Sequence, residues 1–213
     1  MQSLTTLQVY IGKLGNAYMY DCEIAGQTDF FYGFGTCWVT NSAVTLRGCG
    51  GGITAWKGTN TTFENKYGVY IHDSDVRKAN ASLEITHKCY LGRPWNALHR
   101  SIFSHSYLDD SINPSGYVQW GSSDPRINQS KSRNSTIVLT LLLTVSVLHI
   151  DTTMAEYESY GPGYNATGRA AAANVTIELT KEQYTPFSIL ERVFQFPTGK
   201  FGNTAWIDKQ PRA

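Results

Sequence analysis

The sequence predicts an all-β fold, and three observations support this prediction. Short runs of apolar and β-branched residues recur between polar turns rich in Gly, Asn and Asp. Glycine accounts for 19 of the 213 residues and aromatic residues for 13%, a composition that suits a turn-rich β protein. Long amphipathic helical patterns are absent from the region that contains these runs. The chain length fits one core, so we expect a single domain, residues 1–213.

The expected strands are short and follow one another between Gly, Asn and Asp residues. In chain order they are residues 7–11, 17–20, 37–40, 69–71, 83–86, 101–104 and 117–120. One short helix is expected near the C-terminus, at residues 181–184, as a peripheral element. Periodicity alone does not distinguish a β-sandwich from a solenoid, so both remain open from these patterns.

Composition excludes several classes of partner. The net charge is +1 and 16% of residues are charged, so no strong electrostatic field would hold nucleic acid or an acidic membrane.

The chain begins Met-Gln-Ser-Leu, without the basic and apolar segments of a signal peptide. Six Asn-x-Ser/Thr sequons nevertheless suggest secretion. They begin at Asn60, Asn80, Asn128, Asn134, Asn165 and Asn174.

Four cysteines, Cys22, Cys37, Cys49 and Cys89, are present, and none of their spacings matches a Cys-x-x-Cys metal pair. We interpret them as buried thiols or as one structural disulfide, with three pairings possible if all four are oxidised. The histidines and acidic residues also lack the spacing of zinc or calcium motifs. No metal and no cofactor is therefore expected.

Four motifs occur in a fixed order along the chain. They are GQTDFFYG at residues 26–33, LGRPW at 91–95, DDSINPSG at 109–116, and Glu156-Tyr157 followed by GPG at 161–163. In this order they resemble the pectinesterase family, and secreted fungal members most closely. The resemblance covers roughly residues 6 to 208 with one interruption. It implies a right-handed parallel β-helix, a solenoid in which each coil covers the next and substrate lies in a cleft on one outer face.

The resemblance also implies a reaction and the residues that carry it out. Family members hydrolyse galacturonate methyl esters of pectin to pectate and methanol with two carboxylates in different protonation states. Asp29 matches the nucleophile, and Arg93 matches the arginine that orients it by a charge-assisted pair. Trp95 matches the tryptophan that stacks on a sugar ring, so Trp95 and Arg93 are the expected substrate-binding residues. Pectin is the implied partner of a secreted, extracellular monomer.

Two positions depart from the family pattern. Family members carry Gln-Asp-Thr-Leu where this chain has Leu4, Thr5, Thr6 and Leu7. The family aspartate is general acid and then base, and a threonine hydroxyl has a pKa too high for that role. The nearby acids Asp21 and Glu23 are not aimed at the ester by any sequence feature. The chain is therefore expected to resemble the C-terminal part of a pectinesterase, truncated at its N-terminus. The alternative function is a catalytically inactive pectin-binding pseudoenzyme.

Residues 129–150 do not match the family. Their second half, residues 137–148, is apolar on every face, but the run is shorter than the ~20 residues that cross a bilayer. A core strand or helix is the ordinary alternative. Because deletion of residues 129–150 joins Asn128 to Asp151 and restores a family-like sequence, we favour a retained-intron-like insert. We expect it to lie outside the β-helix and to take no part in chemistry.

Overall fold

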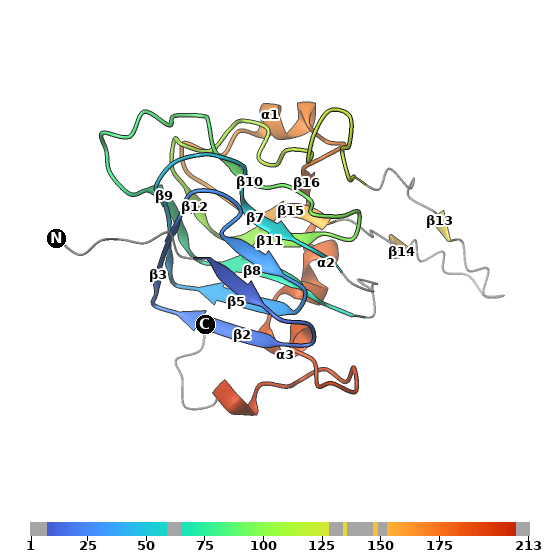
Figure 1. The fold of residues 1–213 in the computed structure, drawn as a ribbon. Coiled ribbons are helices and arrows are strands. Elements are labelled where there is room, and N and C mark those ends of the chain that lie inside the picture. The colour runs from blue at the N-terminus through green and yellow to red at the C-terminus, as the bar shows by residue number, and fades with distance from the viewer. Residues whose placement is uncertain (1–7, 59–64, 128–133, 136–146, 149–152, 208–213) are drawn as a thin grey trace.

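The chain winds through three parallel sheets in the computed structural model, which describes residues 8–58, 65–127, 134–135, 147–148 and 153–207 (Figure 1). The first sheet contains β1 (Val9–Ile11), β4 (Phe31–Gly33), β7 (Gly52–Trp56) and β10 (Tyr90–Gly92). The second contains β2 (Asn16–Tyr20), β5 (Thr36–Thr40), β8 (Gly68–His72), β11 (Arg100–Ser104), β15 (Thr153–Tyr157) and β16 (Ile177–Glu178). The third contains β3 (Glu23–Gly26), β6 (Ala43–Leu46), β9 (Asp75–Lys78) and β12 (Tyr107–Leu108).

Successive strands enter the three sheets in turn, so each coil lies on the one before it. The pairs β2–β5, β5–β8 and β8–β11 are all parallel. In-register stacking places Val39, Ile71 and Phe103 in one column, and all three are fully buried. Such columns fill the interior and exclude water from the apolar side chains. The predicted right-handed parallel β-helix is confirmed.

The second sheet is buried on both faces, which explains why β5 and β11 are buried at every position. Its outer face carries Trp38, Tyr70 and Ile102, which pack against the C-terminal segment. That segment forms α2 (Lys181–Tyr184), η1 (Thr185–Phe187), α3 (Leu190–Val193) and η2 (Ala205–Ile207) (Figure 1). The helix predicted at residues 181–184 is therefore confirmed as α2.

Two predicted strands are wrong. Residues 83–86 and 117–120 form turns and irregular structure and belong to no strand, although the Val118 N–H donates to the Gly92 carbonyl of β10 at 3.1 Å. The Tyr117 hydroxyl points inward and shares its one proton between the Ser101 and Ala155 carbonyls, 3.0 and 3.2 Å away, which anchors the segment. Trp120 instead turns outward against Arg93 and Arg126. Apolar character in these segments reflects side-chain anchoring and not a β ladder.

A repeated turn joins the second sheet to the third. The residue after each of five strands adopts a left-handed φ of 44° to 52° and is followed by Ser, or by Cys in the first coil. These pairs begin at Asp21, Asn41, Asp73, His105 and Glu158. The backbone N–H of Ser42 donates to the Ser74 hydroxyl at 3.2 Å, and the Ser74 N–H donates to Ser106 at 3.3 Å. The resulting serine ladder fixes the same bend in successive coils.

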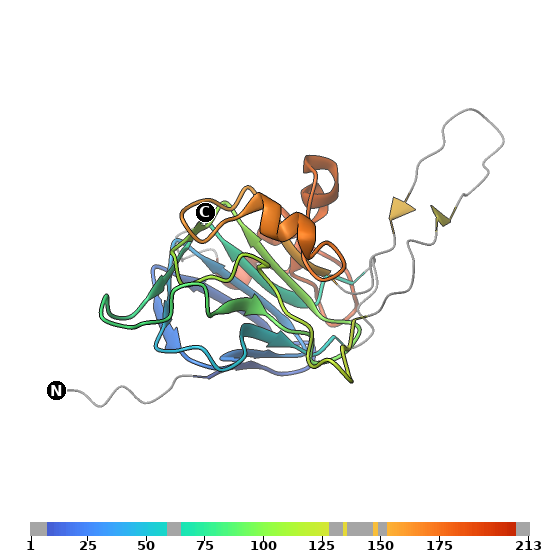
Figure 2. The same ribbon diagram turned by 90° about the horizontal axis from the view of Figure 1, so that it is seen from above.

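The interruption in the family pattern coincides with one long coil. The strands β5, β8 and β11 begin at residues 36, 68 and 100, but β15 begins only at residue 153. Within the insert, β13 (Asn134–Ser135) and β14 (Val147–Leu148) pair with each other, antiparallel, and with no strand of the three sheets (Figure 2). The rest of residues 129–150 lies outside the described residues, so the retained-intron interpretation stays a prediction.

Among the helices that the structure describes, none is long and apolar enough to cross a membrane.

A buried polar chain crosses the interior at His99. Its Nδ1 lies 2.9 Å from the Trp56 carbonyl, which can only accept, so Nδ1 carries the proton. Its Nε2 then accepts from the Ser101 hydroxyl at 2.7 Å. Ser101 Oγ lies 3.1 Å from Thr54 Oγ1 and from the Tyr117 hydroxyl. Burial lowers the pKa of His99 to about 3 because a charged imidazole loses its hydration there.

This lowered pKa predicts acid destabilisation. Between pH 6.5 and pH 3 the unfolded chain binds a proton at residue 99 and the folded chain does not, so stability falls as the pH falls. The cost is up to ~1.4 kcal/mol per pH unit. Urea unfolding at pH 6.5 and 4.5 should therefore show wild type losing ~2–3 kcal/mol more than His99→Gln. Equal losses in both proteins would contradict a neutral buried His99.

Candidate active site

Asp29 and Arg93 form an ion pair at the first sheet. Asp29 lies in the turn between β3 and β4, and Arg93 directly follows β10. Arg93 Nε donates to both carboxylate oxygens, at 3.0 and 3.1 Å, and Nη2 donates to Oδ2 at 2.6 Å. The Asp29 side chain is 18% exposed and the Arg93 side chain is 23% exposed, so water reaches the pair only in part. The structure thus brings together two residues that lie 64 positions apart in the chain.

The backbone around Asp29 also fixes its carboxylate. Asp29 has a φ of 48°, a conformation that is uncommon for residues other than Gly, Asn and Asp. Its N–H donates to the Gly52 carbonyl at 2.7 Å, and the Gly52 N–H donates back to Oδ1 at 3.0 Å. A Cβ at Gly51 would lie 2.8 Å from Asp29 Oδ1 and 2.9 Å from Arg93 Nη2. Glycine is therefore needed at position 51 for the backbone to approach the ion pair so closely.

Trp95 lies among aromatic rings beside the ion pair. Its indole is stacked near Tyr32, with ring centroids 6.1 Å apart, and lies 6.4 Å from Trp120. Arg93 and Arg126 each place a guanidinium over the Trp120 ring, at 4.3 and 4.2 Å. Trp95 remains 37% exposed, so one part of the ring faces solvent. The arrangement offers an apolar platform next to a carboxylate.

A cleft of about 280 Å³ opens beside these residues. Its lining includes Cys49, Gly51, Arg93 and Trp120. Sequence reasoning missed Trp120, which was assigned to a strand, and gave no role to Tyr32, although Tyr32 lies in the same motif as Asp29. The signal for Tyr32 was its position three residues after Asp29, within β4, the strand that follows the Asp29 turn. Trp120 carried no comparable signal, because an irregular segment brings it to the cleft.

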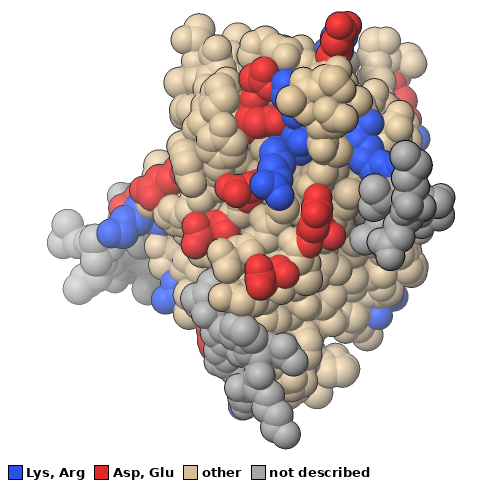
Figure 3. All heavy atoms as spheres, turned by 90° about the vertical axis from the view of Figure 1, so that its left-hand side faces the viewer, with Lys and Arg blue, Asp and Glu red and all other residues tan. Residues whose placement is uncertain are grey.

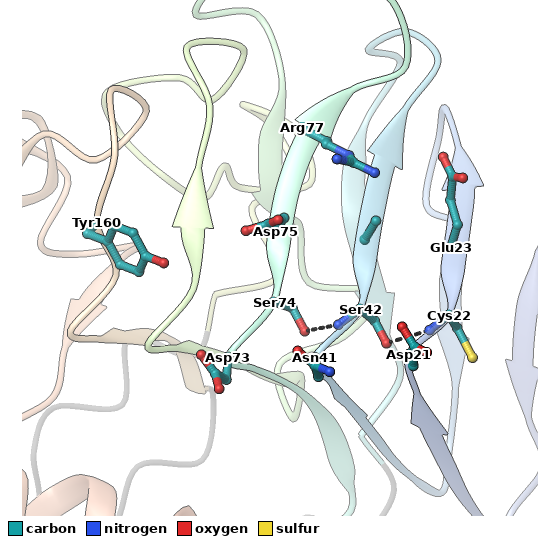
Figure 4. A pocket seen from close by; sticks show the side chains of 11 residues that line it. Asp21, Cys22, Glu23, Asn41, Ser42, Asp73, Ser74, Asp75, Arg77 and Tyr160 are labelled. Carbon is teal, nitrogen blue, oxygen red and sulfur yellow. Dashed lines mark hydrogen bonds between the residues drawn. The ribbon is translucent and has the colours of Figure 1, made fainter. Parts of the chain in front are cut away.

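A second hollow, of about 440 Å³, lies on the third sheet and is separate from this cleft. It is polar, and its side chains come from β3, β6, β9 and the turns before them (Figure 4). Acidic side chains surround a few basic ones on the face of the molecule where β3, β9 and β12 lie (Figure 3). Asp21 and Glu23 line this hollow together with Arg77. The two acids therefore do not line the cleft that contains Arg93.

Leu4 and Thr5 lie outside the described residues. The strand β1, which begins four residues after Thr5, pairs with β4 in parallel, and Val9 lies opposite Phe31. The Val9 N–H donates to the Phe30 carbonyl at 2.6 Å, next to Asp29. The N-terminal strand thus enters the first sheet beside the Asp29 turn. The assignment of Thr5 to the family acid position stays a prediction.

The remaining two motifs meet at Arg169 and not at the cleft. Arg169, in α1 (Ala166–Ala171), is fully buried and pairs with Glu156 at 2.5 Å. Its guanidinium also donates to the carbonyls of Asn113, Pro114 and Gly163, at 3.0, 2.8 and 3.3 Å. Burial raises the pKa of Glu156, and the pairing with Arg169 opposes that rise. This cluster is structural, and sequence reasoning missed Arg169 as its centre.

One disulfide joins the coils next to the cleft. Cys49 is bonded to Cys89, while Cys22 is an exposed thiol and Cys37 a buried one. The interpretation as one structural disulfide is confirmed, together with one buried thiol, whereas Cys22 lies at the surface. Burial raises the pKa of the Cys37 thiol to about 12, which keeps it protonated. Closing a loop of 40 residues stabilises the fold by ~4 kcal/mol in the chain-entropy model.

Among the described residues, no group of three or more His, Cys, Asp or Glu side chains could hold a metal ion.

Comparison with solved structures supports the fold. A crystal structure of the pectin methylesterase from Aspergillus niger matches 90% of this chain and 49% of its own, with 23% identity and a TM-score of 0.55. The pectin methylesterase from carrot matches 89% of this chain and 54% of its own, with 20% identity and a TM-score of 0.62. A pectin methylesterase in complex with a hexasaccharide matches 91% and 55%, with 22% identity and a TM-score of 0.63. At these identities the likeness concerns the fold alone.

Sequence comparison identifies the family. "Probable pectinesterase A" of Aspergillus niger is 34% identical over 106 residues, which is 50% of this chain and 31% of the relative. "Pectinesterase 2" of Citrus sinensis is 27% identical over 181 residues, or 79% of this chain and 29% of the relative. The chain thus spans about a third of these curated relatives and about half of the solved chains. The Pectinesterase family model matches residues 6–129, which include Asp29, Arg93 and Trp95. The chain therefore belongs to the pectinesterase family.

Proposed function

We propose that this chain is a carbohydrate esterase of the pectinesterase type that acts on methyl-esterified pectin, with Asp29 as its nucleophile. The observation that carries the proposal is the ion pair in which Arg93 donates to both oxygens of Asp29, beside the exposed ring of Trp95. The guanidinium fixes the orientation of the carboxylate, as a nucleophile requires. An exposed indole next to it suits the apolar face of a sugar ring.

The reaction follows from these positions. A carboxylate oxygen of Asp29 attacks the ester carbonyl carbon, the C–OCH₃ bond breaks, and the departing methoxide takes up a proton from solvent water. Water then attacks the resulting acyl-enzyme, releases the free galacturonate carboxylate and regenerates Asp29. Arg93 holds the carboxylate in place throughout, and Trp95 and Trp120 hold the sugar. No metal and no cofactor enters the scheme.

A second candidate function is pectin binding without turnover. The specific observation in its favour is Thr5, which stands where family members carry the acid that protonates departing methanol. Binding through the aromatic rings needs no such acid, so the cleft would still hold the polysaccharide. Under either function we propose an extracellular monomer whose partner is pectin. The Cys49–Cys89 disulfide and the six sequons support an oxidising, secretory environment.

Binding tests the proposed cleft. Trp95→Ala is expected to weaken the affinity for a methyl-esterified oligogalacturonate about tenfold, ~1.4 kcal/mol, because the stacking platform is lost. Isothermal titration calorimetry measures the affinity directly. Trp206→Ala is the matched control, since Trp206 is 49% exposed but packs on Phe194 in the C-terminal segment. Equal affinities of wild type and Trp95→Ala would refute the assignment of this cleft to pectin.

A further inference from the structure

The Cys49–Cys89 disulfide lies next to the proposed catalytic pair on both of its chain segments. Cys49 precedes β7 by three residues, and the glycines that follow it reach the ion pair. Gly51 lies close to the Arg93 and Asp29 side chains, and the Gly52 N–H donates a hydrogen bond to the Asp29 carboxylate. Cys89 directly precedes β10, whose last residue is followed by Arg93. Cys49 and Arg93 also line the same cleft. One covalent bond therefore joins the segment that holds Asp29 to the segment that carries Arg93.

The two ends of this bond differ in how firmly the rest of the fold holds them. Cys89 is 2% exposed, its N–H donates to the Ser111 carbonyl at 2.9 Å, and its carbonyl accepts from Asn113 at 2.7 Å. Cys49 is part-exposed and lies in a turn with glycine at positions 48, 50, 51 and 52. Glycines restrain the backbone little, so that turn depends on its crosslink more than the Cys89 segment does.

We propose that the Cys49–Cys89 disulfide is a positioning crosslink, which holds the glycine turn 48–52 against Asp29 and Arg93. Its reduction loosens the ion pair while the β-helix stays folded. Any effect of reduction on ester hydrolysis rests on the proposed function. The effect of reduction on the Asp29–Arg93 ion pair does not depend on that function. The accessible sulfur is Cys49 Sγ, because Cys49 lines the open cleft and Cys89 is buried.

A dithiol reduces the Cys49–Cys89 disulfide in two exchange steps. One thiolate of the reagent attacks Cys49 Sγ, the S–S bond breaks, and Cys89 leaves as a thiolate that takes up a proton. The second thiol of the reagent then displaces Cys49 and closes a cyclic disulfide. The protein gains two thiols, and the dithiol is oxidised by the same two electrons.

The test reads the ion pair itself and needs no substrate. In protein labelled with ¹⁵N arginine, the Arg93 Nε–H is expected to exchange with solvent slowly, because it donates to Asp29. Dithiothreitol should accelerate that exchange at least ~10-fold, the change expected when a hydrogen bond of ~1.4 kcal/mol is lost. The Arg169 Nε–H, buried against Glu156, is the internal control and should not change. Arg93→Lys assigns the resonance by removing it.

Matched variants complete the design. Cys49→Ser/Cys89→Ser should reproduce the fast Arg93 exchange without dithiothreitol, and Cys22→Ser, at an exposed thiol, should behave as wild type. Unchanged Arg93 exchange after complete reduction would overturn the proposal, as would equal acceleration at Arg93 and Arg169, which indicates general unfolding. A failure of the proposed function would be seen separately, as absence of oligogalacturonate binding by the oxidised protein.

Discussion

The chain is expected to release no measurable methanol from methyl-esterified pectin. Thr5 offers no proton for departing methanol and no base for water, and loss of general acid–base catalysis costs about 10²–10⁴-fold. The resemblance implies that Leu4 takes the place of a glutamine that stabilises the oxyanion in family members, and loss of such a donor is expected to cost about 10²–10³-fold. If the two losses were independent, turnover would be about 10⁴–10⁷-fold slower than in an intact relative. Methanol assayed over hours with purified protein measures this.

The control for this prediction places an aspartate at position 5 and leaves Leu4 unchanged. Thr5→Asp alone is expected to leave methanol release below detection, because Leu4 still provides no amide. The same assay with an intact Aspergillus pectin methylesterase establishes the detection limit. Release by the unmodified chain at a rate near that of the intact enzyme would show that another group is the acid and base. The Thr5 interpretation would then be wrong.

Arg169→Met is expected to destabilise the fold by ~3–5 kcal/mol. The substitution removes the partner of Glu156, whose carboxylate is 1% exposed, and leaves an uncompensated buried charge. It also removes the donor for the Asn113, Pro114 and Gly163 carbonyls. The loss therefore affects three segments of the chain at once. Urea unfolding followed by far-UV circular dichroism measures the change in the free energy of unfolding.

The double variant Glu156→Gln/Arg169→Met is the matched control. With the charge at position 156 removed, the cost should fall well below that of Arg169→Met alone, because buried ion pairs often break even with neutral replacements. A single variant that loses less than ~1 kcal/mol would contradict the central structural role of Arg169. Arg126→Met removes a surface ion pair with Asp124 together with the contacts to Trp120 and the Trp95 carbonyl, and its cost should stay well below that of Arg169→Met.

The apolar runs predicted β1, β2, β5, β8 and β11, because these strands contain consecutive apolar or β-branched residues, whereas the parallel β-helix was expected from the resemblance. The other strands of the three sheets, including all four of the third sheet, were not predicted, and some of them, such as β3 and β9, mix charged residues with apolar ones. The turn pairs such as Asn41-Ser42 and Asp73-Ser74 carried a usable signal, because each follows a strand of the second sheet. The pairs that begin at residues 41, 73 and 105 recur every 32 residues, but those at 21 and 158 depart from this spacing, which concealed the repeat.

The site was predicted from the resemblance and not from local pattern. Asp29 and Arg93 lie in different coils, and only the stacking of β4, β7 and β10 brings them together. No periodicity in the sequence encodes that contact. The roles of Arg169 and Trp120 could not be predicted, because each depends on an irregular segment that packs against distant carbonyl groups or rings. The resemblance drew its site residues from the first two motifs, and the other two motifs meet at the buried Arg169 cluster.

An activated ester tests the central claim, that Asp29 is a nucleophile oriented by Arg93, most directly. A nitrophenyl ester of an oligogalacturonate has a leaving group that departs as a stable anion, so it does not need the acid that Thr5 cannot supply. The chain is predicted to release nitrophenolate in a burst and to gain the mass of one acyl group, while Asp29→Asn does neither. Equal release of nitrophenolate by wild type and Asp29→Asn would contradict the account.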